Sequence, residues 1–336
     1  MLKVLTEAFG VSGYEAVVRD IIYKEIKDFC TEIKVDSMGN MSVFKKAKGG
    51  SSNKKVLLAA HTDEVGLIVT DITEDGYLKF APIGGMDPKV FISQRVTIGD
   101  IKGVIALKAI HLTTAEERKK PVDINQLYID IGAKDRADAE KYVSKGDYCA
   151  FDSKYEEFGG IIKAKALDDR VGCMIMIDML KRDWNVDLYC NFTAQEEMGI
   201  RGAMVASRGI KPDYAIVLEG TTCNDLPKTN ETMKVTRRGQ GPALSVLDLA
   251  SKANPELMDM LMAAAKKYDI PYQFRASTVG MNDAGAICIA DGGVKAASVS
   301  VPCRYIHSPV NVMSKKDFED CERLIEAFLK ELGEDN

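Results

Sequence analysis

The segment Lys55-Val56-Leu57-Leu58-Ala59-Ala60 is the stretch on which the fold depends, because apolar residues follow Lys55 without interruption. A strand with one face in water alternates apolar and polar residues, whereas a strand covered on both faces reads as a continuous apolar run. We therefore expect a central strand of an α/β sheet here. The run ends at His61, so this strand should carry an ionisable side chain at its carboxyl end.

Outward from this strand, the patterns predict further helices and strands in alternation. Ser12 and Glu15 have capping-box spacing, which predicts a helix from about Tyr14 to Asp28. Alternating residues predict strands at Glu32–Asp36 and Met41–Phe44. After Ala166 we expect helices at Asp169–Lys181, Arg201–Arg208, Pro255–Tyr268 and Lys315–Glu331, and strands at Asp187–Thr193, Tyr214–Leu218 and Ala296–Val301.

Between these two α/β parts, the pattern changes to short β-rich runs separated by glycine turns. Gln94–Ile98 and Lys102–Ala106 are two such runs, separated by Gly99-Asp100. We therefore predict an inserted β domain at residues 67–160. It interrupts a single α/β domain formed by residues 1–66 and 161–336.

The composition is that of an ordinary soluble protein with no strong charge bias. The 336 residues include 46% hydrophobic and 28% charged residues, with a formal net charge of −5, which argues against nucleic acid as the main partner. Early charges interrupt any signal-like segment, and no stretch reaches the length of a membrane span. The eight cysteines contain no CxxC pair. We expect a cytoplasmic protein without a membrane partner.

Ionisable residues follow four of the predicted apolar strands, and one more precedes a strongly apolar helix. Ligands of open α/β sheets gather at the carboxyl ends of strands. Taken singly, such residues are ordinary helix caps or solvated loop residues. Taken together, two imidazoles and several carboxylates suit divalent zinc, cobalt or manganese, and one carboxylate could bridge two ions. The candidates are His61, Asp168, Glu196, Glu197, Glu219 and His307.

Two further features bear on the chemistry of this predicted site. Asp63 follows His61 by two residues, so in an extended segment both side chains share a face and the carboxylate can orient the imidazole. Adjacent Glu196 and Glu197 point in different directions from an extended strand. One of them could therefore hold metal while the other takes a proton from bound water.

Several segments resemble the successive signatures of the M42 aminopeptidases, in order and over nearly the whole chain. They are Ala60-His61-Thr62-Asp63-Glu64-Val65-Gly66, Lys165-Ala166-Leu167-Asp168-Asp169-Arg170, Gln195-Glu196-Glu197-Met198-Gly199-Ile200-Arg201-Gly202-Ala203 and Arg304-Tyr305-Ile306-His307-Ser308-Pro309. The resemblance implies a mixed-sheet zinc-aminopeptidase domain of the phosphorylase/hydrolase-like α/β class, interrupted by a small β-barrel-like domain. It also implies homo-oligomers, commonly dodecamers built from dimers, with the inserted domain serving oligomerisation.

The resemblance also implies a role for each candidate residue. One divalent ion (zinc, cobalt or manganese) would be bound by His61 and Glu219, a second by Glu197 and His307, and Asp168 would bridge both. Glu196 would then be the general base, and Asp63 would orient His61. The implied activity is removal of single residues from the free N-terminus of short peptides.

The chain departs from the family pattern at three positions. Thr62 stands where Met is usual, Glu219 where Asp is frequent, and Asn282 where Thr is usual. Glu219 can still bind metal, but its extra methylene could change the metal spacing. We interpret Asp283, which follows Asn282, as a helix cap without a catalytic role.

Two alternatives remain at this point. A metal-free glycoside hydrolase (endoglucanase) would need two carboxyl groups flanking a sugar, but metal binding explains the carboxylates better, and the single Trp184 gives little aromatic platform. An inactive peptide-binding scaffold would be expected to lack a ligand or the base, whereas all are present. The preferred N-terminal residue of the substrate does not follow from the sequence.

Overall fold

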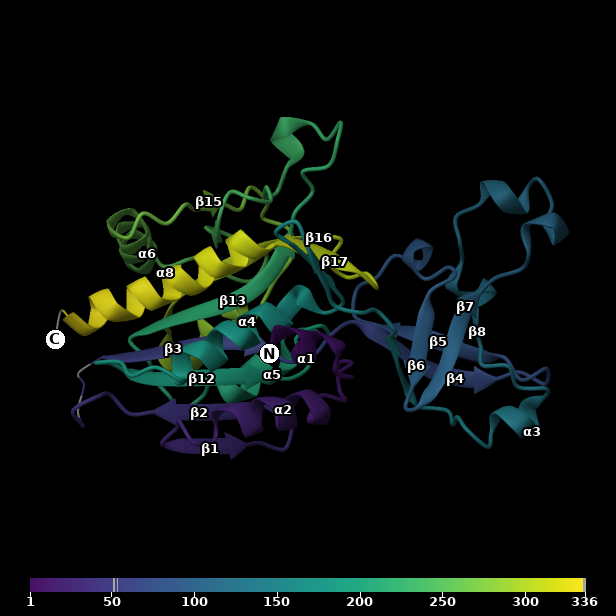
Figure 1. Cartoon of the computed structure of the whole chain (residues 1–336), viewed down its shortest axis with the longest axis horizontal. Coiled ribbons are helices and arrows are strands. Elements are labelled where there is room, and N and C mark those ends of the chain that lie inside the picture. Colours follow the sequence, from purple (N-terminus) through teal and green to yellow (C-terminus); the bar gives the residue numbers. More distant parts are fainter. Residues whose placement is uncertain (51, 53, 335–336) are drawn as a thin grey trace.

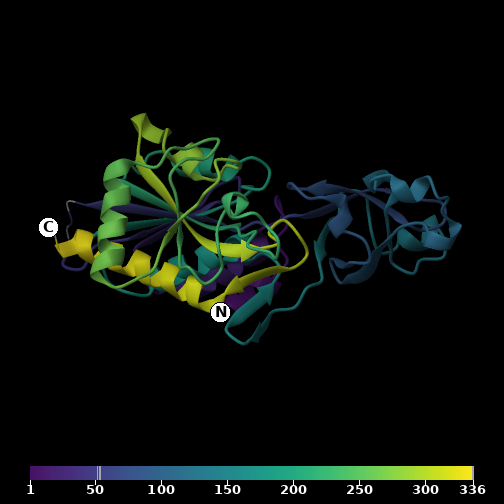
Figure 2. The same cartoon turned by 90° about the horizontal axis from the view of Figure 1, so that it is seen from above.

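The computed structural model describes residues 1–50, 52 and 54–334. An α/β body and a smaller all-β body lie side by side along the long axis of the molecule (Figures 1 and 2). This arrangement confirms the predicted fold class: an α/β domain with a mixed sheet, whose chain is interrupted by a β barrel.

The α/β body is built on an 11-stranded mixed sheet with the main strand order β1-β2-β12-β3-β13-β16-β17-β11-β10. The neighbours β12, β3, β13 and β16 are parallel, and the outer pairings are antiparallel. Strands β14 and β15 join the sheet beside β16. The strands are β1 Glu32–Val35, β2 Met41–Lys45, β3 Lys55–His61, β10 Glu156–Phe158, β11 Ile161–Ala164, β12 Asp187–Thr193, β13 Tyr214–Thr222, β14 Ala243–Ser245, β15 Gln273–Phe274, β16 Lys295–Arg304 and β17 Asn311–Ser314.

Strand β3 is covered on both faces, as its apolar run predicts. Val56 and Leu58 belong to the large core on one face, whereas Leu57 and Ala59 belong to a separate core on the other. All four side chains are fully buried. The central position of β3 therefore follows from its lack of a polar face.

Helices cover both faces of this sheet. Helix α4, which contains Val171 and Met176, packs in the large core, and helix α5, which contains Ala203, packs in the smaller one. The predicted helix after Ser12 begins at Ala16, and Ser12 does not cap it; instead, Glu15 accepts hydrogen bonds from the Gly13 and Gln195 amides. The capping-box prediction was wrong. The helices are α1 Leu2–Glu7, α2 Ala16–Ile26, α4 Leu167–Leu180, α5 Arg201–Ala206, α6 Pro255–Lys267, α7 Ala284–Ile287 and α8 Lys315–Glu334.

The smaller body is a closed barrel with the strand order β4-β5-β8-β7-β6-β9 and its own apolar core. Val11 of the α/β body packs against Ile83 and Ala150 of the barrel. The predicted limits of the insert, residues 67 and 160, stay a prediction. The barrel elements are β4 Gly66–Ile72, β5 Leu78–Ile83, β6 Arg95–Ile98, β7 Ile101–Ala106, β8 Tyr128–Asp130, α3 Arg136–Ala139 and β9 Tyr148–Phe151.

Two strands run further than predicted, and this extension matters for the site. Strand β13 continues past Leu218 to Thr222, so Glu219 lies within the strand and not after it. Strand β16 continues past Val301 to Arg304. Within the part of the chain that the structure describes, every helix is too short or too polar to cross a membrane.

Candidate functional site

The parallel strands carry the candidate residues to one edge of the sheet. His61 is the last residue of β3 and lies opposite Thr193, the last residue of the neighbouring strand β12. Glu196 and Glu197 follow β12, Glu219 lies in β13, and His307 follows β16. Because carboxyl ends of parallel strands share one sheet edge, residues distant in sequence meet here.

Asp168 lies between the two histidines. Its Oδ1 is 3.4 Å from His61 Nε2, and its Oδ2 is 3.8 Å from His307 Nε2. Each oxygen of one carboxylate therefore faces a different imidazole, which is the arrangement that a bridging carboxylate requires. The remaining two carboxylates are divided in the same way, because Glu219 lies 3.6 Å from His61 Nε2 and Glu197 lies 3.4 Å from His307 Nε2.

Asp63 connects His61 to the two adjacent glutamates. The carboxylate lies 3.3 Å from His61 Nδ1, on the side of the ring away from Asp168. Its two oxygens also accept hydrogen bonds from the backbone amides of Glu196 and Glu197, both at 3.1 Å. The fully buried Asp63 therefore fixes the orientation of the imidazole and the position of the loop after β12 together.

Glu219 supplies an observation that fits a cation. Its Oε1 is buried and has no hydrogen-bond partner among the described residues, although buried carboxylate oxygens are normally paired. Next to it, Gly220 donates its amide to Asp168 Oδ1 at 3.3 Å. A Cβ at Gly220 would lie 2.9 Å from Asp168 Cα and Cβ, so glycine is needed for Asp168 to approach the strand.

His307 is oriented by the barrel side of the molecule. Its Nδ1 is 2.8 Å from the carbonyl oxygen of Gly85, which lies just after β5. The Nδ1–H donates to this carbonyl, which leaves Nε2 free to face Glu197 and Asp168. The orientation of His307 thus depends on a contact between the two bodies of the molecule.

A buried ion cluster lies behind the segment that follows β3. Glu64 accepts a hydrogen bond from Lys165 Nζ at 2.5 Å and lies 3.5 Å from Arg170 Nη2. The fully buried Arg170 also donates to the carbonyl oxygen of Thr62 at 2.9 Å. Removing one member would leave a buried charge without its partner, so this cluster holds residues 62–64 in place beside the site.

Burial and mutual repulsion dominate the electrostatics of the carboxylates. Burial raises the pKa of Glu196, Glu197 and Glu219 well above the ordinary range, and neighbouring carboxylates raise each pKa further. Burial alone would lower the pKa of His61, but Asp168 and Asp63 outweigh it and raise the pKa well above its usual value. A divalent cation would relieve this repulsion, and the imidazole and carboxylate donors suit zinc, cobalt or manganese.

The sequence did not predict that Asp169 lies at the site, and for Asp283 it predicted the position but not the side-chain contact. Asp169 is fully buried, its oxygens accept the amides of His61 and Gly172, and a carboxylate oxygen lies close to ligand atoms of His61 and Glu219. Only its place beside Asp168 in the sequence pointed to it.

Asp283 occupies a helix N-cap position but makes no side-chain cap; its Oδ2 accepts the Thr193 hydroxyl at 2.5 Å. Asp283 therefore lies at the predicted cap position, but its side chain binds Thr193 and does not cap the helix.

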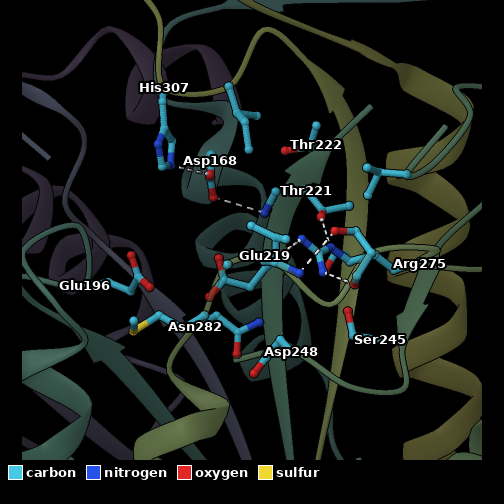
Figure 3. A pocket seen from close by; sticks show the side chains of 18 of the residues that line it. Asp168, Glu196, Glu219, Thr221, Thr222, Ser245, Asp248, Arg275, Asn282 and His307 are labelled. Carbon is cyan, nitrogen blue, oxygen red and sulfur yellow. Dashed lines mark hydrogen bonds and ion pairs between the residues drawn. The ribbon is translucent and has the colours of Figure 1, made fainter. Parts of the chain in front are cut away.

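The site opens into a cavity of about 350 Å³. Asp168, Glu196, Glu219 and His307 line one part of it, and Arg275 reaches into it from the opposite side (Figure 3). Glu197 is not part of this lining; it faces a small pocket behind His307. The two adjacent glutamates therefore do point in different directions, as the sequence predicts.

The fold and the clustered imidazoles and carboxylates define an α/β protein of the peptidase type with a candidate metal site. A family model described as M42 glutamyl aminopeptidase matches residues 39–324. The chain belongs to this family.

Three relatives illustrate the likeness. A putative aminopeptidase of Acetivibrio thermocellus is 38% identical, over 97% of this chain and 96% of the relative. A lysyl aminopeptidase of Pyrococcus furiosus is 34% identical, over 99% and 96%. A solved structure of the Pyrococcus horikoshii TET1 peptidase has a TM-score of 0.87 at 31% identity, over 98% of each chain; that peptidase is described as able to assemble into a tetrahedron or a large octahedral shell.

Metal binding should stabilise the protein, because it offsets repulsion among buried carboxylates. Adding Zn²⁺, Co²⁺ or Mn²⁺ to metal-free protein at about 100 times the Kd should raise the Tm by roughly 5 °C, measured by calorimetry. Asp168→Asn should remove most of this rise.

Asp317→Asn is the matched control, because Asp317 is equally a buried carboxylate that accepts two backbone amides, but it lies on α8 away from the site. This variant should keep the metal-dependent rise. Equal Tm with and without all three metals in the unsubstituted protein would contradict a metal site.

Proposed function

We propose that this chain is a dinuclear-metal aminopeptidase that hydrolyses the N-terminal peptide bond of short peptides. Membership of the M42 family and the aminopeptidase relatives support the aminopeptidase activity. The observation that carries the two-metal assignment is Asp168, whose two carboxylate oxygens face His61 and His307 separately. Glu219 would complete the first ligand set and Glu197 the second.

The bound ions would supply Lewis-acid chemistry that makes water nucleophilic near neutral pH. Proton transfer and the positioning of the ligands would be carried out by side chains of this protein. Glu196 lines the cavity, where its carboxylate can take a proton from the attacking water and give it to the leaving amine. Asp63 acts as a positioning residue, because it orients His61 and holds the Glu196 amide.

Two features of the cavity support a substrate with a free N-terminus. Four of the five residues that would hold the ions line it, so a bound ion could anchor the neutral α-amine of a peptide, a group that an internal residue lacks. The cavity volume of about 350 Å³ is near the lower end of the range for ligand pockets, which suits the end of a peptide and not the middle of a chain. The comparisons do not favour the glycoside hydrolase alternative.

Replacing Glu196 tests the proposed mechanism. Glu196→Gln keeps the shape of the side chain and removes the proton carrier, so kcat on aminoacyl p-nitroanilides should fall by about 10²- to 10⁴-fold. Metal content, measured by mass spectrometry, should stay unchanged. Glu74→Gln, at an exposed glutamate of the barrel, is the control and should keep full turnover.

Near-normal turnover of Glu196→Gln with both metals bound would refute the role of Glu196. Absence of hydrolysis by the unsubstituted, metal-loaded protein on every aminoacyl substrate would instead favour the inactive scaffold.

For the assembled state, we propose a homo-oligomer, a dodecamer built from dimers, in which residues 67–160 form an oligomerisation domain. The shell-forming P. horikoshii relative supports this proposal. Ile110 and Leu112 of the barrel are 71% and 62% exposed, as suits residues that become covered on assembly. A cytoplasmic location is part of the same proposal.

The mass in solution tests the assembly. Light scattering should give the mass of a dodecamer, and replacing both Ile110 and Leu112 by Glu should reduce it. A monomeric mass for the unsubstituted protein at micromolar concentration would contradict the proposal.

A further inference from the structure

Glu196 lines the cavity (Figure 3), but no side-chain contact fixes the position of its carboxylate. Within the part of the chain that the structure describes, this carboxylate makes no hydrogen bond and no ion pair. Glu197, in contrast, lies 3.4 Å from His307 Nε2. The direction of the Glu196 side chain is therefore set by the backbone from which it projects.

That backbone is held from outside at four consecutive amides. Each amide of residues 194–197 donates a hydrogen bond to a side-chain oxygen of another segment. The acceptors are buried, so water does not compete for these amides. They are Asn40 Oδ1 for residue 194 at 2.8 Å, Glu15 Oε1 for residue 195 at 3.2 Å, and the two oxygens of Asp63 for residues 196 and 197, both at 3.1 Å.

Gln195 is the residue of this loop whose conformation most needs support. Its φ is +55°, in the left-handed region that residues other than glycine seldom adopt. Such conformations persist only where surrounding contacts impose them. The amide that Glu15 accepts belongs to this residue, and Glu196 follows it directly. Without that hydrogen bond, the turn before Glu196 would lose one of its restraints.

Glu15 is itself fixed beside the segment that follows β3. Its Oε1 also accepts the amide of Gly13 at 2.6 Å. The amide of Ser12 donates to the carbonyl oxygen of Glu64 at 3.1 Å, and the Glu64 amide donates to the carbonyl oxygen of Gly10 at 3.0 Å. Since Glu64 belongs to the buried ion cluster, Glu15 is held by the same rigid surroundings as residues 62–64.

We propose that Glu15 is a positioning residue for Glu196: by accepting the Gln195 amide, it fixes the turn that directs the Glu196 carboxylate into the cavity. This inference rests on the proposed function, in which Glu196 is the general base. Both hydrogen bonds that the Glu15 carboxylate accepts come from residues that are not candidate metal ligands, and Glu15 does not line the cavity. Its action on the reaction is therefore indirect.

Two substitutions at Glu15 separate the acceptor oxygen from the charge. Glu15→Met has a similar length but no acceptor, so kcat of the metal-loaded protein on its fastest aminoacyl p-nitroanilide should fall by about 10- to 100-fold, as expected for a misplaced catalytic group. Glu15→Gln keeps a carbonyl oxygen for the Gln195 amide and should lose less than about fivefold. KM and metal content should change by less than about twofold in both variants.

A second background distinguishes positioning of Glu196 from general support of the fold. In Glu196→Gln, the added substitution Glu15→Met should cause no further loss of kcat, because residues that act as a unit are not additive. Asp187→Leu is the matched control: it removes a carboxylate that accepts one backbone amide, that of Ala47 at 3.0 Å, at the opposite end of β12. This control should keep full turnover.

Three results would overturn the inference. The first is unchanged kcat in Glu15→Met with its circular dichroism spectrum intact. The second is loss of bound metal with kcat restored by excess metal, which would make Glu15 a support of the metal site. The third is an equal loss of kcat from Glu15→Met in the unsubstituted and Glu196→Gln backgrounds.

If Glu15→Met does not fold, Glu15→Asp is judged by the same criteria, because it keeps the charge but is one methylene too short to reach the Gln195 amide. Near-normal turnover of Glu196→Gln itself, or absence of hydrolysis of every substrate by the unsubstituted protein, would instead overturn the proposed function on which the inference rests.

Discussion

The arrangement of the site depends on one electrostatic constraint, the need to compensate carboxylates that are buried together. Asp168, Glu197 and Glu219 lie within a few ångströms of the two histidines, and burial disfavours the charged forms of Glu197 and Glu219. Hydrogen bonds from backbone amides compensate some oxygens, such as those of Asp63. Glu219 Oε1 has no such partner among the described residues, and this is the strongest local reason to place a cation there.

The site also depends on both bodies of the molecule, because the barrel side orients one candidate ligand. The sheet edge supplies His61 and Glu219, but His307 is the most exposed of the candidate ligands, at 40% of its side chain. Its ring is held by the carbonyl oxygen of Gly85 on the barrel side. The insertion after β3 therefore contributes directly to the geometry of the site and is not only an appendage of the α/β body.

The sequence predicted the fold class and named residues that the structure brings together at one sheet edge, because both predictions depend on local patterns. The apolar run before His61 required a doubly covered strand, and the parallel neighbours of that strand carried the other candidates to the same edge. Contacts between residues that are distant in the sequence could not be predicted from these local patterns. Asp283 illustrates this limit, because its position suggested a helix cap while tertiary packing directs it to Thr193. Arg275 likewise gave no signal, since only folding brings it to Thr221.

The central claim is that Asp168 bridges two metal ions, and anomalous diffraction from crystals grown with Mn²⁺ or Zn²⁺ tests it most directly. The account predicts two anomalous peaks, one between His61 and Glu219 and the other between Glu197 and His307, with an oxygen of Asp168 bound to each. A single peak on one side of Asp168 at saturating metal, or two peaks that Asp168 does not contact, would contradict it.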